Sequence, residues 1–220
     1  MAERDLNLWN FPDPESADED GILCIGGPLN GKILIEAYRQ GIFPWNNPDE
    51  PTLWWSPDPR MVIFPETLYC SKSMRQVLKR QVFEITINHS FEKVIDHCAS
   101  VNRKDQYGTW ISSELKNAFL QAHELGIALS VEAWRDGKLA GGLFGMSFGH
   151  FFTGDSMFSL EPNASKAAFL TFAQQQFEQG LELIDCQVYT DHMASLGARL
   201  IARSEFLRLI KNKSHLNDGS

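Results

Sequence analysis

Paired cysteines, long apolar runs and glycine-rich phosphate loops are all missing from this sequence, and each absence excludes a class of protein. Its four cysteines are scattered without paired spacing, which indicates reduced thiols rather than a disulfide framework or a zinc site. No apolar run reaches the roughly 18 residues that a membrane helix needs, and the first residues do not resemble a secretory signal. Neither kind of nucleotide-binding glycine loop is present. We therefore expect a protein of the cytoplasm that contacts no membrane and needs no metal. We also expect a monomer.

Basic residues are fewer than acidic ones, so the surface as a whole should repel nucleic acid. The formal net charge is −8, although 43% hydrophobic and 22% charged residues are ordinary for a globular protein. A local exception follows Ser71, where four basic residues form a single stripe on one helix face: Lys72, Arg75, Lys79 and Arg80. This stripe is either a solvated helix face or a contact for phosphates.

The order of elements predicts an α+β fold built around an antiparallel meander. Strands are expected at 22–25, 61–64, 83–88, 127–134, 139–146, 150–153, 181–188 and 200–202. Helices should follow the capping residues Asn30, Ser71, Ser90, Ser112, Asn163, Thr190 and Ser204. Asp136-Gly137 predicts a tight hairpin.

The segment from Phe43 to Arg60 is rich in proline and tryptophan, which favours an irregular loop between two domains. We expect a small domain at 1–60, a larger one at 61–213 and a frayed tail at 214–220.

Polar side chains beside bulky apolar ones mark the candidate site. Asp185 and Gln187 lie two positions apart in an expected strand, so they share a face and are about 7 Å apart along the chain. Asp155 is expected at a strand end, where it could reach a cleft. A carboxylate among apolar neighbours needs a partner or a catalytic role. For Asp185, a structural role that uses backbone N–H groups remains open.

Several other motifs do not support a known chemistry. Gly154-Asp155-Ser156-Met157-Phe158 lacks the last glycine of a nucleophile elbow, and no second histidine completes a zinc-protease helix after His123-Glu124. Asp191-His192 is more typical of a capped surface pair than of a catalytic dyad. Tryptophans in the expected loops could either stack on bases or pack between domains.

Ten ordered motifs give the sequence a resemblance to a known family, from about Phe11 to Phe206. They are Asp20-Gly21-Ile22-Leu23 with Gly26-Gly27, Gly41-Ile42-Phe43-Pro44-Trp45, Trp54-Trp55-Ser56-Pro57-Asp58-Pro59-Arg60, Gly108-Thr109-Trp110-Ile111, Ser130-Val131-Glu132-Ala133-Trp134, Gly141-Gly142-Leu143-Phe144-Gly145, Ser156-Met157-Phe158-Ser159, Asn163-Ala164-Ser165-Lys166, Ile184-Asp185-Cys186-Gln187 and Ser195-Leu196-Gly197-Ala198. With these motifs the chain resembles the leucyl/phenylalanyl-tRNA–protein transferases.

The resemblance implies a small N-terminal domain on a larger domain of the acyl-CoA N-acyltransferase (GNAT-like) fold, acting without acyl-CoA. The implied reaction moves Leu or Phe (or Met) from charged tRNA to the α-amino group of a protein that begins with Arg or Lys. Its product would be marked for degradation by the N-end rule pathway. A tRNA ester is already activated, so no cofactor is implied.

The resemblance also assigns roles to individual residues. It implies that Asp185 and Gln187 form a relay that helps to deprotonate the amine, with Asp155 at the same site. Trp45 and Trp110 match the tryptophans that hold the terminal adenosine of the tRNA. The basic stripe would contact phosphates of the acceptor stem. For the apolar cup around the Leu or Phe side chain we choose four residues: Leu143, Met157, Phe172 and Ile184.

Three positions depart from the family pattern. Asp155 stands where the family usually has Glu, which shortens the reach of the carboxylate by one methylene and puts turnover in doubt. Leu129 replaces a usual His, and Ala202 replaces a usual Pro. A catalytically impaired tRNA- or peptide-binding protein is therefore one alternative. An acetyl-CoA-dependent N-acetyltransferase is another, although its pyrophosphate-binding turn is not found in the sequence.

Overall fold

The structure is a computed structural model, and it describes residues 9–45, 50–100 and 110–211 of the chain. The predicted tail at 214–220 lies outside these residues, and so do Gly108 and Thr109 of one family motif. Within the described part, no helix combines the length and the apolar character needed to cross a membrane.

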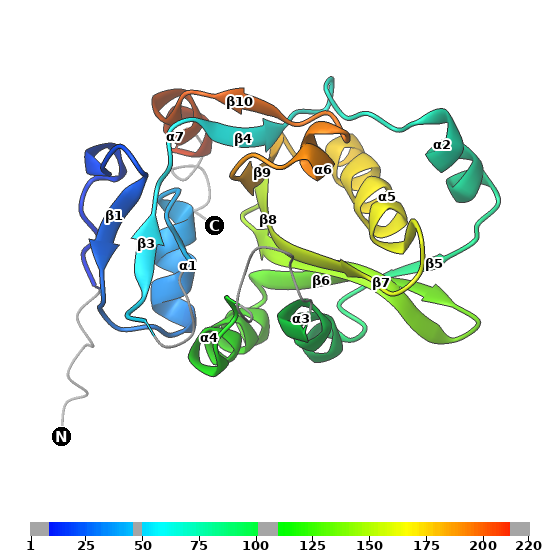
Figure 1. Cartoon of the computed structure of the whole chain (residues 1–220), viewed down its shortest axis with the longest axis horizontal. Helices are drawn as coiled ribbons and strands as arrows, with labels where there is room; N and C mark the ends of the chain where they lie inside the picture. Colours follow the sequence, from blue (N-terminus) through cyan, green and yellow to red (C-terminus); the bar gives the residue numbers. More distant parts are fainter. Residues whose placement is uncertain (1–8, 46–49, 101–109, 212–220) are drawn as a thin grey trace, which may run out of the picture.

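The described residues form a large mixed sheet, shown in green, cyan and orange in Figure 1. Its strands, in spatial order, are β10 (Arg199–Ile201), β4 (Arg60–Ile63), β9 (Leu183–Gln187), β8 (Phe151–Ser159), β7 (Lys138–Ser147), β6 (Ala128–Arg135) and β5 (Glu84–Ile87). Neighbouring strands are antiparallel except β8 and β9, which are parallel. The predicted hairpin joins β6 to β7, where Asp136 and Gly137 have φ angles of 50° and 71°.

A smaller sheet lies in the N-terminal part, with the order β1 (Ile22–Ile25), β3 (Leu53–Trp55) and β2 (Phe43–Pro44). The prediction of an irregular loop from Phe43 to Arg60 is therefore wrong at Trp54 and Trp55, which lie in the central strand β3. Trp54 is fully buried, and its indole N–H donates to the carbonyl of Gly26 at 2.9 Å. Aromatic residues suit a half-buried strand, and this preference outweighed the nearby prolines.

The helix α5 covers one face of the large sheet and α3 and α4 cover the other, and the remaining helices lie around them (Figure 1). They are α1 (Gly31–Arg39), α2 (Lys72–Lys79), α3 (Phe91–Ser100), α4 (Ser113–Glu124), α5 (Ala164–Glu178), α6 (Asp191–Ala194) and α7 (Arg203–Lys211), after a 3₁₀ turn at Pro14–Ser16. Adjacent strand residues point to opposite faces, so Leu143 packs in the cluster with α5 while Phe144 packs in the cluster with α3 and α4.

Side-chain caps explain where several helices begin. Asn30, Ser71, Ser112 and Thr190 each accept a hydrogen bond from a backbone N–H in the first turn, as predicted. Asn163 instead adopts a left-handed conformation with φ 73° and makes no side-chain cap. The last helix begins at Arg203, one residue before the expected cap Ser204.

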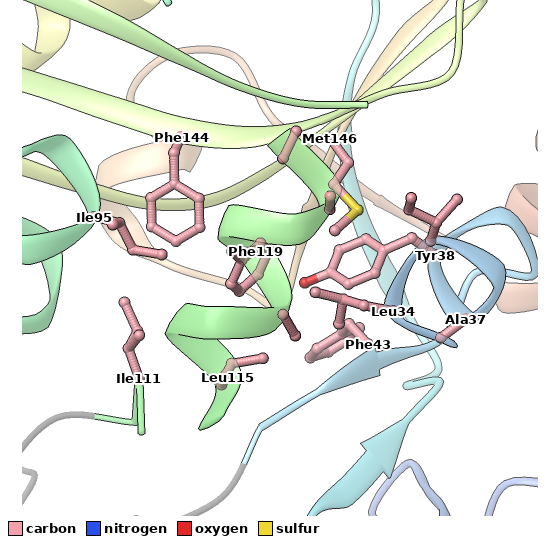
Figure 2. Packing of buried hydrophobic residues seen from close by; sticks show 14 of the residues in the cluster. Leu34, Ala37, Tyr38, Phe43, Ile95, Ile111, Leu115, Phe119, Phe144 and Met146 are labelled. Atoms are coloured by element: carbon pink, nitrogen blue, oxygen red, sulfur yellow. The ribbon is translucent and has the colours of Figure 1, made fainter. Parts of the chain in front are cut away.

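One apolar cluster joins the N-terminal part to the larger sheet. Figure 2 shows Leu34 and Tyr38 of α1 close to Phe119 of α4, with Phe144 of β7 beyond it. The rings of Phe119 and Phe144 pack edge to face with their centres 4.9 Å apart, and the ring centre of Tyr38 lies 6.3 Å from that of Phe119. The division at residue 60 stays a prediction, but residues on its two sides share a core. This packing brings Tyr38 to the functional site.

Candidate active site

The site lies where β8 and β9 separate. Their parallel pairing covers only Phe151–Thr153 and Leu183–Asp185. The residues that come next in the chain, Gly154–Met157 and Cys186–Val188, line a cavity of about 380 Å³. Where two central strands separate, their backbones no longer pair with each other, and the space between them is part of the cavity.

A β-bulge places Asp155 in this split. Phe144 of β7 pairs with Ser156, but the next residue, Gly145, pairs with Gly154, so Asp155 is the extra residue. A Cβ at Gly145 would lie 1.8 Å from the carbonyl oxygen of Thr153, which explains the glycine there. The prediction that Asp155 ends a strand is wrong, because β8 continues to Ser159.

The carboxylate of Asp155 has two donors on one oxygen. The hydroxyl of Tyr38 donates to Oδ1, and Nε2 of Gln187 donates to the same atom at 3.0 Å. Oδ2 is buried and makes no hydrogen bond to any described residue. Burial raises the pKa of Asp155 to about 7, against the hydrogen bonds of Tyr38 and Gln187, which favour the ionised form. Asp155 can therefore gain or lose a proton near neutral pH.

Asp185 lies behind this group rather than in the cavity. Its carboxylate accepts two hydrogen bonds from the guanidinium of Arg60, at 2.8 Å and 2.7 Å, and both side chains are buried. It also accepts the backbone N–H of Gln187 at 2.8 Å, which holds Gln187 at a left-handed φ of 63°. The expectation that Asp185 is poorly solvated is confirmed, whereas its carboxylate is not part of the cavity wall. Through this hydrogen bond it holds the backbone of Gln187, and its part in catalysis stays a prediction.

Arg60 is itself enclosed by aromatic rings. Its guanidinium carbon lies 4.7 Å from the ring centre of Phe43 and 4.6 Å from that of Phe206. Such rings favour a buried cation electrostatically. The ion pair therefore joins β4 and β9 at the rear of the site.

Most of the expected substrate residues line the cavity, namely Trp45, Trp110, Leu143, Met157 and Ile184. Phe172 does not. It packs behind the cavity against Phe152, with ring centres 4.8 Å apart. Further lining residues that the sequence analysis missed are Phe43, Phe169, Cys186, His192 and Met193. Phe169 and Phe172 are three apart on α5, so helical spacing alone could not decide which faces the ligand.

The basic stripe lies on the outside of α2. All four of its residues are exposed, while Met74 of the same helix is buried. The helix packs against α5, whose Phe169 lines the cavity. The tRNA-binding role of the stripe stays a prediction.

No metal centre is evident in the residues described. Among them, no three His, Cys, Asp or Glu side chains come together in a group that could hold a metal ion. The Cys186 thiol lines the cavity, and burial raises its pKa well above the usual value, so it is uncharged at neutral pH.

Comparison with known proteins assigns the chain to a family. A family model described as leucyl/phenylalanyl-tRNA protein transferase matches residues 62–211, and a model of the N-terminal domain of that family matches residues 27–58. The leucyl/phenylalanyl-tRNA–protein transferase of Flavobacterium johnsoniae is 50% identical over 92% of this chain and 96% of that protein. The enzyme of the same name from Syntrophus aciditrophicus is 52% identical over 91% of this chain and 84% of its own length.

Among solved structures, a GCN5-related N-acetyltransferase from Kribbella flavida matches with a TM-score of 0.40 and 15% identity. The match covers 78% of this chain and 60% of the acetyltransferase chain.

The fold and the family matches together define an aminoacyltransferase with an α+β architecture and a small N-terminal domain, as expected. The chain belongs to the leucyl/phenylalanyl-tRNA–protein transferase family.

Proposed function

We propose that this chain moves Leu or Phe (or Met) from charged tRNA to the α-amino group of proteins that begin with Arg or Lys. The product would enter N-end rule degradation in the cytoplasm. The observation that carries the proposal is the hydrogen-bonded pair of Asp155 and Gln187 in a cavity with apolar and aromatic walls. A primary amine that attacks an ester needs a proton acceptor and an anion-stabilising donor, and this pair supplies both.

The walls of the cavity suggest how the aminoacyl end of the tRNA is held. Its volume of about 380 Å³ lies within the range of small-molecule sites. Trp45 and Trp110 offer aromatic faces on which the terminal adenine can stack. Leu143, Met157 and Ile184 form an apolar surface for a Leu, Phe or Met side chain, and the flexible Met157 can adapt to all three.

Asp155 would accept the proton that the amine must lose. Its Oδ2 makes no hydrogen bond to the described residues, and a pKa of about 7 suits a general base at neutral pH. The amine nitrogen then forms a bond to the ester carbonyl carbon, and the bond from that carbon to the ribose oxygen breaks. A proton from the nitrogen passes to the ribose oxygen.

Gln187 would stabilise the tetrahedral intermediate. One N–H of its side-chain amide binds Asp155, and the other can donate to the oxyanion. Asp185 would act through Gln187, because it accepts the backbone N–H of that residue. The ester is already activated, so these steps require neither a metal nor a nucleotide cofactor.

The test is a transfer assay with labelled Phe-tRNA or Leu-tRNA and a peptide that begins with Arg. We expect label in the peptide that survives ribonuclease and is lost in Asp155→Asn. Asp136→Asn is the matched control, because Asp136 is an exposed aspartate in the β6–β7 turn. Binding of charged tRNA without transfer would favour the impaired binder. Acetylation of the peptide from acetyl-CoA would favour the N-acetyltransferase.

A further inference from the structure

His192 lines the cavity but has no part in the steps above. It lies in α6, the short helix that follows β9, between Thr190 and Met193, which also line the cavity. Its Nε2 is buried and makes no hydrogen bond within the described part of the chain. Burying a polar atom without a partner is unfavourable. A ligand that donates to Nε2 would remove this cost.

Two hydrogen bonds hold the backbone on either side of His192. The side chain of Thr190 accepts the N–H of Met193 at 3.1 Å, and the hydroxyl of Ser195 donates to the carbonyl of His192 at 2.6 Å. Asp191 is exposed, and its carboxylate accepts the hydroxyl of Tyr189 at 2.9 Å. The prediction of a surface pair between Asp191 and His192 is therefore wrong, because each side chain has a different environment.

The surrounding groups keep the imidazole uncharged. Burial lowers the pKa of His192, and the positive charge of Lys166 on α5 lowers it further. Asp155 on β8 and Cys186 on β9 are the other titratable groups of the same cavity. A neutral imidazole with its proton on Nδ1 has an acceptor at Nε2. Such an acceptor can bind an N–H group without repelling a cationic substrate.

Of the substrate parts, the acceptor amine fits this position best. The adenosine and the aminoacyl side chain are matched by the aromatic and apolar walls, which leaves two α-amino groups as donors for Nε2, that of the aminoacyl ester and that of the acceptor peptide. Val188 is exposed and lines the cavity together with Thr190 and His192, so the cavity is open to solvent on this side and a peptide can enter there.

We propose that His192 binds the acceptor: its Nε2 accepts a hydrogen bond from the α-amino group of the incoming peptide. The inference rests on the proposed function and assigns a separate binding residue to the second substrate, the acceptor peptide. It follows that His192 determines the KM for the peptide but not the KM for the charged tRNA.

Two substitutions in the purified chain test this role with Phe-tRNA and an Arg-initiated peptide. His192→Phe keeps an aromatic ring but removes the acceptor, so we expect the peptide KM to rise about 10-fold, with the KM for Phe-tRNA unchanged. His192→Gln retains a carbonyl acceptor, so its peptide KM should return toward the wild-type value. His97→Gln is the control, because His97 stacks on Phe158 at 4.7 Å and does not line the cavity.

Each outcome decides a different question. An unchanged peptide KM in His192→Phe, or equal increases for both substrates, would overturn the assignment. So would a peptide KM in His192→Gln as high as that of His192→Phe, because shape rather than an acceptor would then matter. Failure of the wild-type chain to transfer any label contradicts the proposed function itself, before any variant is compared.

Discussion

Two opposing influences act on the pKa of the Asp155 side chain. Burial favours its neutral form, while Tyr38 and Gln187 both donate to Oδ1 and favour the anion. The result is a pKa of about 7 instead of 3.8. A carboxylate in this state is ionised just above neutral pH yet remains a stronger base than an ordinary aspartate.

We therefore expect kcat for transfer, measured with both substrates saturating, to rise with pH through about 7. The reason is that Asp155 is protonated below its raised pKa and ionised above it. Asp155→Asn should lower kcat by about 100-fold or more and remove the rise. A pH–rate profile of the two proteins checks this. If the same rise persists in Asp155→Asn, another group titrates.

Tyr38→Phe extends this test. The hydrogen bond from Tyr38 lowers the pKa of Asp155, so its loss should move the midpoint of the rise to higher pH. Tyr69→Phe serves as the control, because Tyr69 is exposed and does not line the cavity. A midpoint that does not move would mean that this hydrogen bond has no influence on the reacting group.

At the scale of elements, β4 and β9 are joined by the buried pair of Arg60 and Asp185. We expect Asp185→Asn to reduce the free energy of unfolding by about 3–5 kcal/mol, because the guanidinium would remain buried without its counter-ion. Arg60→Met should cost a similar amount, and the double variant Arg60→Met, Asp185→Asn should cost less than the sum of the two single variants. Urea denaturation measures all three. Losses below about 1 kcal/mol in both single variants would show that water relieves the unpaired charge.

The sequence predicted elements better than the contacts between them. Capping residues such as Ser71 and Ser112 act within one helical turn, so their helices could be located from local pattern. The bulge at Asp155 arises from the register of β7 against β8, and register is not local. The partner of Asp185 is 125 residues away in the chain, so sequence could show that a partner was needed but not that it was Arg60.

At the scale of the whole molecule, the site combines parts that lie far apart in sequence. Tyr38 comes from α1 in the N-terminal part, Asp155 from β8 and Gln187 from β9. The shared core of α1, α4 and β7 holds these parts in place (Figure 2). The face that α5 turns to the cavity is also set by the whole fold, because only the packing of the helix on the sheet selects Phe169 over Phe172.

The distribution of charge limits where the chain can bind RNA. With a net charge of −8, the chain repels RNA as a whole, so binding must depend on a local cluster of cations. At the C-terminal end of α2, Lys79 and the C-cap Arg80 are exposed and form no ion pair with any described residue. We expect Lys79→Ala, Arg80→Ala to weaken tRNA binding and to reduce the slope of log K against log salt by about 1 for each phosphate that is no longer bound.

The control for that experiment must change the net charge by the same amount. Lys32→Ala, Lys93→Ala removes two exposed lysines, from α1 and α3, and therefore makes the whole molecule equally more negative. Titration of charged tRNA at several salt concentrations separates the two effects. General repulsion would weaken binding equally in both double variants. A phosphate contact on α2 would instead reduce the salt slope only when Lys79 and Arg80 are replaced, because counterion release requires a cation at the phosphate itself.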